Sequence, residues 1–234
     1  KCRALDPPGT DYSQAIPNLS NRHWDYANYV AKEVKKRDPK LGVAMLAYTA
    51  YSSPPTHLDT FEDNVYVSLT FSAAYCVKPE RKKAIYDNID GWKTKGVKLV
   101  GYEYWGMHYW LDLPYLFTAE IADLMPRLHD RGMVALHGEA GKNFGNQGPN
   151  YFLAAHLMWD PKADGAAILD RYYRAFGPAA GPVRKYYETF ETALRENSGH
   201  IRDFGYHSLI NSWPEVFPAQ TIQQAGRHLA EAQA

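Results

Sequence analysis

The sequence has little cysteine, no long apolar run and no excess of charge of either sign. Its 234 residues include 2 cysteines, and 26 lysine and arginine residues balance 26 aspartate and glutamate residues. This balance provides no field that would steer a polyanion, so we expect no nucleic acid partner. The longest apolar run, Val43 to Ala47, is much shorter than the roughly 20 residues that cross a bilayer. We therefore expect no membrane span.

The scarce cysteines and several missing motifs exclude further kinds of site. Cys2 and Cys76 are too few and too far apart for a disulfide framework or a zinc knuckle. They can pair once or remain thiols, and we interpret them as thiols. Neither a Gly-x-Gly-x-x-Gly motif nor a phosphate-binding loop occurs, and no Gly-x-Ser-x-Gly elbow supports a Ser-His-Asp triad. We expect no cofactor.

Aromatic residues are frequent instead, at 14% of the chain, and strand patterns alternate with helical ones. Four apolar or β-branched segments are typical of strands buried on both faces, namely residues 42–48, 64–71, 97–103 and 133–139. Apolar residues recur at helical spacing in residues 81–95 and 114–131, and each segment leads into a glycine and then a strand. This alternation predicts an α/β fold with a parallel sheet.

The predicted strands make up half of a (β/α)8 barrel, which has eight strands and about 250 residues. The segment Lys1 to Tyr12 is typical of a βα loop whose strand lies upstream, so we interpret the chain as the C-terminal half of a barrel. We expect a partial barrel domain over residues 1–160 and a helical region packed on it over residues 161–234. Within these, a loop is predicted from Gly141 to Asn150, followed by helices at 151–159, 163–176, 179–197 and 219–234.

Apolar residues of the third predicted strand lead directly into Glu103, which lies among aromatic residues that include Trp105 and Trp110. A carboxyl group surrounded by apolar rings is partly removed from water, which raises its pKa and suits it to act as a general acid. The rings offer flat apolar faces with polar tips, which fit the CH faces of sugars. His108 adds a polar contact in the same segment.

The fourth predicted strand also ends in an acid, Glu139, which follows His137 and Gly138. Lys142 and Asn143 add hydrogen-bonding groups just after it. Two carboxylates at neighbouring strand ends are what glycosidic hydrolysis needs, because one protonates the leaving oxygen while the other stabilises or attacks the anomeric centre. Either acid alone is equally well explained as a solvated residue or an ion-pair partner.

These considerations give a set of candidate site residues. Glu103 and Glu139 are the predicted catalytic carboxylates. A long loop of turn residues follows the first strand, and such loops carry the binding residues of barrels. The predicted substrate-binding residues, from this loop and from the two acidic strand ends, are Tyr48, Tyr51, Trp105, His108, Trp110, His137, Lys142 and Asn143.

A metal site is the alternative use of His57, His108 and His137, which all lie near predicted strand ends. No His-Glu-x-x-His spacing supports such a site. His129 and His156 lie within predicted helices, where hydrogen bonds to backbone or water are the usual role. We therefore predict no bound metal.

The order of several short motifs resembles a known family. They are Asn28-Tyr-Val-Ala31, Asp38-Pro-Lys, Leu46-Ala-Tyr48, Pro54-Pro55, Gly138-Glu139, Tyr151 to Pro161, and Phe176 to Ala180 with Tyr186-Tyr187. Over about residues 20–195 the chain resembles a bacterial domain of unknown function regarded as glycoside-hydrolase-like, akin to α-glucuronidases and hexosaminidases. The resemblance implies that the strands are the fifth to eighth of a (β/α)8 barrel and that Glu103 and Glu139 lie near its active centre. Similar proteins carry a cysteine cluster where this chain keeps only Cys2.

We therefore predict a carbohydrate-active hydrolase that acts on an oligosaccharide or polysaccharide and is secreted or periplasmic. One alternative is a non-catalytic glycan-binding module that uses the same aromatic residues. Another is a fragment that is inactive without the other barrel half, because a half barrel leaves open strand edges. In that case the missing half, or a second copy of the chain, is the expected partner.

Overall fold

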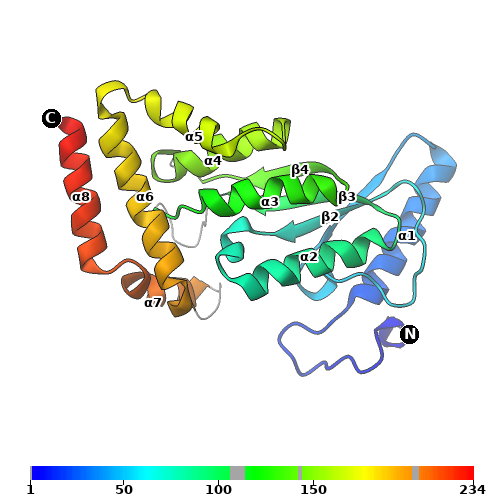
Figure 1. Ribbon diagram of the computed structural model, residues 1–234. Coiled ribbons are helices and arrows are strands. Elements are labelled where there is room, and N and C mark those ends of the chain that lie inside the picture. The colour runs from blue at the N-terminus through cyan, green and yellow to red at the C-terminus, as the bar shows by residue number, and fades with distance from the viewer. Residues whose placement is uncertain (1, 106–113, 142–143, 202–205) are drawn as a thin grey trace. The chain divides into compact units, whose positions relative to one another are not determined.

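A computed structural model describes residues 2–105, 114–141, 144–201 and 206–234 (Figure 1). The chain forms two compact units, and each is described by itself below. Unit 1 consists of Lys1–Phe71, Lys83–Glu103 and His129–His137. Unit 2 consists of Ser72–Lys82, Tyr104–Leu128 and Gly138–Ala234. The predicted domain division at residue 160 stays a prediction.

Unit 1 is built on a four-stranded sheet with the strand order β1-β2-β3-β4 (Figure 1). The strands are β1 (Val43–Ala47), β2 (Val65–Phe71), β3 (Lys98–Tyr104) and β4 (Met133–Glu139). β1 pairs with β2, and β2 with β3, in parallel. The four predicted strands and the α/β class are therefore confirmed. The four strands form an open sheet, with β1 and β4 at its edges.

Burial alternates along the strands, because successive side chains of a strand point to opposite faces. In β2, Val65, Val67 and Leu69 are buried while the residues between them are half-exposed. β3 shows the same alternation, with Leu99 buried and Val100 half-exposed. One face of the sheet is thus covered, and the other is the open face.

Helices cover one face of the sheet. α1 (Ser20–Arg37) contacts β1 and β2, and α2 (Pro79–Lys93) buries Ile89 and Trp92. Trp24 of α1 packs edge-on against Trp92, with ring centroids 4.6 Å apart, and both rings are fully buried. Burying an aromatic ring of this size dominates the energetics of a small core, so this contact fixes the two helices against each other.

The predicted loop between the first two strands is confirmed, and hydrogen bonds from the helices hold it in place. It contains only one short 3-10 helix, η2 (Thr49–Tyr51). The indole N–H of Trp24 donates to the Tyr51 carbonyl at 3.0 Å, and that of Trp92 donates to the Ser52 carbonyl at 2.9 Å. The same two tryptophans therefore anchor both the helices and the loop that follows β1.

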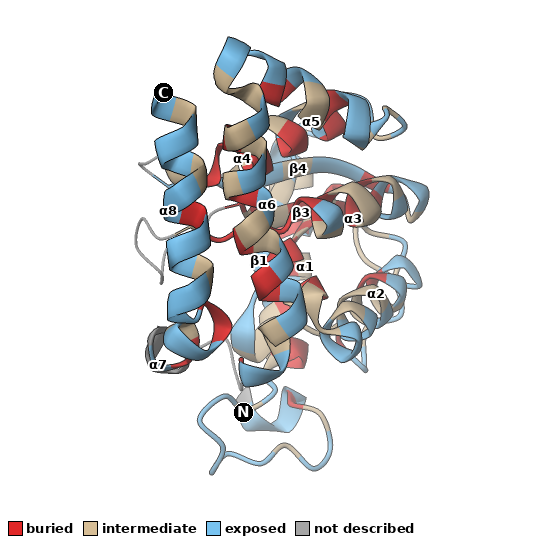
Figure 2. Cartoon of the chain, turned by 60° about the vertical axis from the view of Figure 1, so that its left-hand side comes forward, coloured by how far each residue is buried: buried red, intermediate tan, exposed pale blue. Residues whose placement is uncertain are grey.

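Unit 2 is mostly helical. Its helices are α3 (Thr118–Asp130, whose last residues belong to unit 1), α4 (Phe144–Trp159), α5 (Gly165–Arg174), α6 (Ala180–Asn197), α7 (Tyr206–Val216) and α8 (Ala219–Gln233). α6 contacts α5, α7 and α8, and Figure 2 shows exposed residues over most of α8 with buried ones along α6. Thr118 and the Ala119 amide both donate to the Glu191 carboxylate, which ties α3 to α6. No helix among the described residues is long and apolar enough to cross a membrane.

The predictions for unit 2 were partly wrong. The segment expected to be a loop up to Asn150 is helical from Phe144, with a kink at Gln147. Tertiary contacts explain the difference: Gly148 lies against the Tyr172 hydroxyl, and Asn150 is fully buried and bonds to the backbone of the segment before α3. α7 was not predicted.

A tight contact in the sheet provides a test of the packing in unit 1. A Cβ added at Gly101 would lie 2.8 Å from Met133 Sδ and 3.1 Å from Phe71 Cζ. We expect Gly101→Ala to lower the free energy of unfolding by about 1–3 kcal/mol through overpacking, measured by urea denaturation. The control is Gly226→Ala in α8, where nothing lies within 4 Å, and which should raise stability by about 0.5–1 kcal/mol. Equal effects of the two substitutions would contradict the packing described.

Candidate active site at the sheet edge

The carboxyl ends of the strands of unit 1 bring several of the predicted residues to one edge of the sheet. β1 is followed by Tyr48, β2 ends at Thr70 and Phe71, β3 at Tyr102 and Glu103, and β4 reaches His137. We call Tyr48, Thr70, Tyr102, Glu103 and His137 the sheet-edge cluster. In α/β sheets, ligands bind outside this edge.

Glu103 is the most unusual residue of the cluster, because its side chain is fully buried. It pairs in register with Phe71, and the pleat places it on the covered face with Leu99. A carboxyl group removed from water in this way is held neutral or compensated by its surroundings. The prediction placed Glu103 correctly at a strand end, but the residue sequence did not reveal this depth.

Tyr102 and His137 lie together on the open face of the sheet. Their ring centroids are 5.0 Å apart with a tilt of 43°, and His137 is exposed while Tyr102 is half-buried. They come from neighbouring strands, β3 and β4. An imidazole beside a phenol presents ring faces and polar atoms on the same side of the sheet, which suits a ligand with both CH and OH groups.

Thr70 belongs to the same face but was not among the predicted residues. It pairs in register with Tyr102. Its hydroxyl is buried and has no hydrogen-bond partner among the described residues. Buried hydroxyl groups are normally satisfied, so this atom is an unsatisfied polar group close to the sheet edge. The signal in the sequence was the alternation of Ser68 and Thr70 with apolar residues, which puts polar groups on one face.

The two tyrosines predicted after β1 have different surroundings. Tyr48 is 39% exposed and follows β1 directly, so its ring remains accessible at the sheet edge. The ring of Tyr51 instead stacks on His23 of α1, with centroids 3.9 Å apart and planes 9° from parallel. Tyr51 therefore helps to fasten the loop to α1, and it is less exposed than Tyr48.

Trp105 and Glu139 belong to unit 2 and are brought together there. The Trp105 amide donates to the Glu139 carbonyl at 3.1 Å, and the Trp105 ring is only 5% exposed. This ring lies directly over Gly138, where any Cβ would collide with it. The space that Gly138 leaves is therefore occupied by Trp105. The Glu139 side chain is exposed.

Four of the predicted substrate-binding residues lie outside the described residues. They are His108, Trp110, Lys142 and Asn143.

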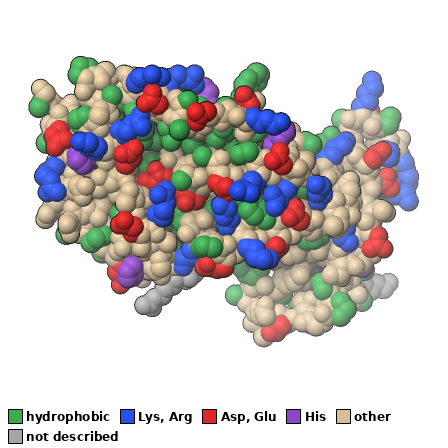
Figure 3. All heavy atoms as spheres, viewed as in Figure 1, with side chains coloured by type: hydrophobic (Ala, Val, Ile, Leu, Met, Phe, Trp, Pro, Cys, Tyr) green, Lys and Arg blue, Asp and Glu red, His purple; other side chains and the backbone are tan. Residues whose placement is uncertain are grey.

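Charged and metal-binding groups do not gather at one place in the part of the chain that the structure describes. Within it, no group of three or more His, Cys, Asp or Glu residues could hold a metal ion. His57, one of the candidate ligands, lies 3.4 Å from the Asp25 carboxylate as an isolated pair. On the face drawn in Figure 3, acidic and basic side chains are interspersed, in keeping with 26 residues of each sign.

The His23 and Tyr51 stack makes the stability of unit 1 depend on pH. Burial lowers the pKa of the His23 imidazole, and its Nε2 atom has no hydrogen-bond partner among the described residues. Since the folded pKa lies below the unfolded value of about 6.5, this stabilisation is present above that value and is lost as the pH falls further. We expect the urea midpoint of the natural protein to fall more than that of His23→Phe between about pH 7.5 and 5. The same pH dependence in both proteins would contradict the burial of this ring.

Comparison with known proteins places the chain in a family. A family model described as a domain of unknown function (DUF4838) matches residues 1–189. Searches of curated proteins and of solved structures find no match. The match confirms the domain of unknown function that the motifs resembled, while the hydrolase activity stays a proposal. The chain belongs to the DUF4838 family.

Proposed function

We propose that this protein is a carbohydrate-active hydrolase that cleaves glycosidic bonds at the carboxyl edge of the sheet in unit 1. The observation that carries the proposal is the fully buried Glu103 at the end of β3. Tyr48, Tyr102 and His137 supply ring faces and polar atoms at the same edge. Within the sheet Glu103 lies on the covered face and these groups lie on the open face, so the proposal requires them to meet at the end of β3, beyond the last strand residues.

In the proposed reaction, Glu103 protonates the leaving oxygen of the glycosidic bond. A second carboxylate must then stabilise or attack the anomeric centre, or activate water. Glu139 is the candidate for this role, because it ends the strand that follows β3 in the sheet and its side chain is exposed to solvent.

The sugar itself is proposed to lie against Tyr48 and Tyr102. CH faces of a sugar ring pack on aromatic rings, while hydroxyl groups need hydrogen-bond partners. His137 and the Thr70 hydroxyl offer such partners on the open face. An oligosaccharide or polysaccharide substrate is consistent with the secreted or periplasmic location that we expect.

We further propose that β1–β4 are four strands of a (β/α)8 barrel. Parallel sheets are normally covered on both faces, but in unit 1 the face that bears Tyr66, Ser68 and Tyr102 is only half-buried. In a barrel, this face would line the interior and the helices would lie outside. The carboxyl edge with Glu103 would then be the end at which barrel enzymes bind their substrates.

The proposal is tested by Glu103→Gln and Glu139→Gln, assayed on a panel of aryl glycosides and oligosaccharides. Each substitution keeps the size of the side chain but removes the acid, so we expect turnover to fall by about 100-fold or more while calorimetry still detects substrate binding. Glu33→Gln is the control, because Glu33 is a half-exposed acid of α1 paired with Lys36 at 2.7 Å. Circular dichroism confirms that the variants are folded.

Two outcomes would contradict the proposal. If both variants keep full turnover, neither carboxyl group takes part in the chemistry. If the natural protein binds glycans across the panel without turning any over, the sheet edge belongs to a glycan-binding module instead.

A further inference from the structure

Unit 2 contains an aromatic pocket that is separate from the sheet-edge cluster. It lies between α4, α5 and α6, has a volume of about 540 Å³, and is lined chiefly by Phe144, Phe152, Arg171, Tyr172, Phe176 and Tyr187. This volume falls within the range of about 300–1,000 Å³ that is usual for small-molecule sites. All of these residues belong to unit 2, so the pocket is formed within one compact body.

The walls of the pocket are aromatic rings in contact with one another. Tyr172 lies at the centre, with ring centroids 5.4 Å from Phe152, 5.5 Å from Phe176 and 6.3 Å from Tyr187. The Tyr187 hydroxyl donates to the Gly145 carbonyl. The polar tip of this tyrosine is therefore used within the protein, and the walls present ring surface to an occupant.

The mouth of the pocket leaves large rings in water. Phe144 is 54% exposed and Phe176 is 41% exposed. Tyr172 and Tyr187, which also line the pocket, are buried. Exposed rings that gather around a concave surface are typical of a binding site.

Among the residues that the structure describes, Arg171 is the only charged one that lines the pocket. Its guanidinium lies over the Phe152 ring, 5.5 Å from the centroid, and donates to His156 Nε2 at 2.6 Å. Among the described residues it forms no ion pair with a carboxylate. The neighbouring arginines differ, because Arg174 and Arg184 both pair with Asp170, at 3.2 and 2.6 Å.

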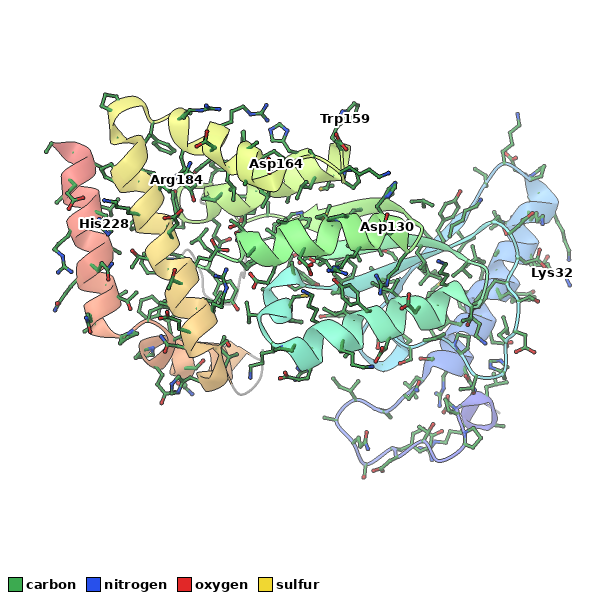
Figure 4. The ribbon with its side chains drawn as sticks, viewed as in Figure 1. Lys32, Asp130, Trp159, Asp164, Arg184 and His228 are labelled. Atoms are coloured by element: carbon green, nitrogen blue, oxygen red, sulfur yellow. The ribbon has the colours of Figure 1, made fainter. Side chains whose placement is uncertain are left out.

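Figure 4 shows Arg184 on α6, the helix next to α5, where its charge is neutralised by Asp170. Arg171 therefore keeps a positive charge that the described residues do not neutralise, at the edge of an aromatic pocket. A guanidinium held in place by a ring and by an imidazole presents its remaining N–H groups in a fixed direction, which suits a carboxylate.

We propose that this pocket binds a planar aromatic carboxylate, with its ring among the phenylalanine and tyrosine rings and its carboxylate on Arg171. The chemistry of the walls favours an aromatic body over a sugar acid. A sugar ring would bury several hydroxyl groups, and each would need a partner. The phenylalanine rings supply none, the Tyr187 hydroxyl already donates to the Gly145 carbonyl, and Arg171 is a single group at the edge. An aromatic ring needs no such partners and stacks on its neighbours.

The test uses calorimetry of the full chain with cinnamate as the probe and cinnamamide as its uncharged analogue. Because hydrogen bonds to charged groups are worth more than neutral ones, we expect cinnamate to bind about 10- to 100-fold more tightly than cinnamamide. Arg171→Gln should remove that preference. Phe176→Ala should weaken both ligands. Arg174→Gln, a control on the same helix, should change neither affinity.

Several results would overturn the proposal. Equal affinities for cinnamate and cinnamamide would remove the role of Arg171, as would a loss in Arg174→Gln equal to that in Arg171→Gln. Tighter binding of glucuronate than of cinnamate would make the pocket a sugar-acid site. Absence of cinnamate binding to the folded natural protein would also contradict it. Glu103→Gln should leave cinnamate binding unchanged, which separates this pocket from the proposed hydrolase.

Discussion

Residues that pair across parallel strands point to the same face of a sheet, and unit 1 is organised by this constraint. Phe71 pairs with Glu103, and Thr70 pairs with Tyr102. The first pair lies on the face covered by α1 and α2, and the second lies on the open face. A slip of β3 by one residue would exchange the two faces, exposing Leu99 to water and burying a tyrosine hydroxyl. The burial of the apolar residues therefore fixes the register, and the register in turn fixes which polar residues lie on the open face.

The covered face also explains how an acid can be placed so deep. Trp24 and Trp92 are fully buried against each other and hold the loop after β1 through their indole N–H groups. These two rings fix the covered face at the end of β1, and Glu103 is buried on the same face at the end of β3. Desolvation of a carboxyl group opposes folding, so enclosing Glu103 requires compensation from the structure around it. The chemistry proposed for the sheet edge therefore depends on the packing of unit 1, because that packing buries Glu103.

Local patterns were enough to predict the four strands, because β-branched and apolar runs end at turn residues. The bounds of Met133–Glu139 agree with the prediction. The start of α4 was missed because Gly148 and Pro149 are local signals for a loop, whereas the buried bonds of Asn150 come from residues far away in the chain. Glu103 could likewise be placed at a strand end, but its burial depends on contacts that no spacing records.

The aromatic residues show why side-chain roles were harder to predict than elements. Trp105 was expected to face a sugar, yet its ring fills the space left by Gly138. Tyr187 of α6 is buried in the packing of unit 2 and also forms a pocket wall. The residues around that pocket come from three helices, so no local period brings them together. A ring on a helix face belongs to the core where the neighbouring helix packs closely against it, and to a binding surface where the neighbouring helix leaves a gap. This difference depends on how the helices pack, so it cannot be predicted from one helix alone.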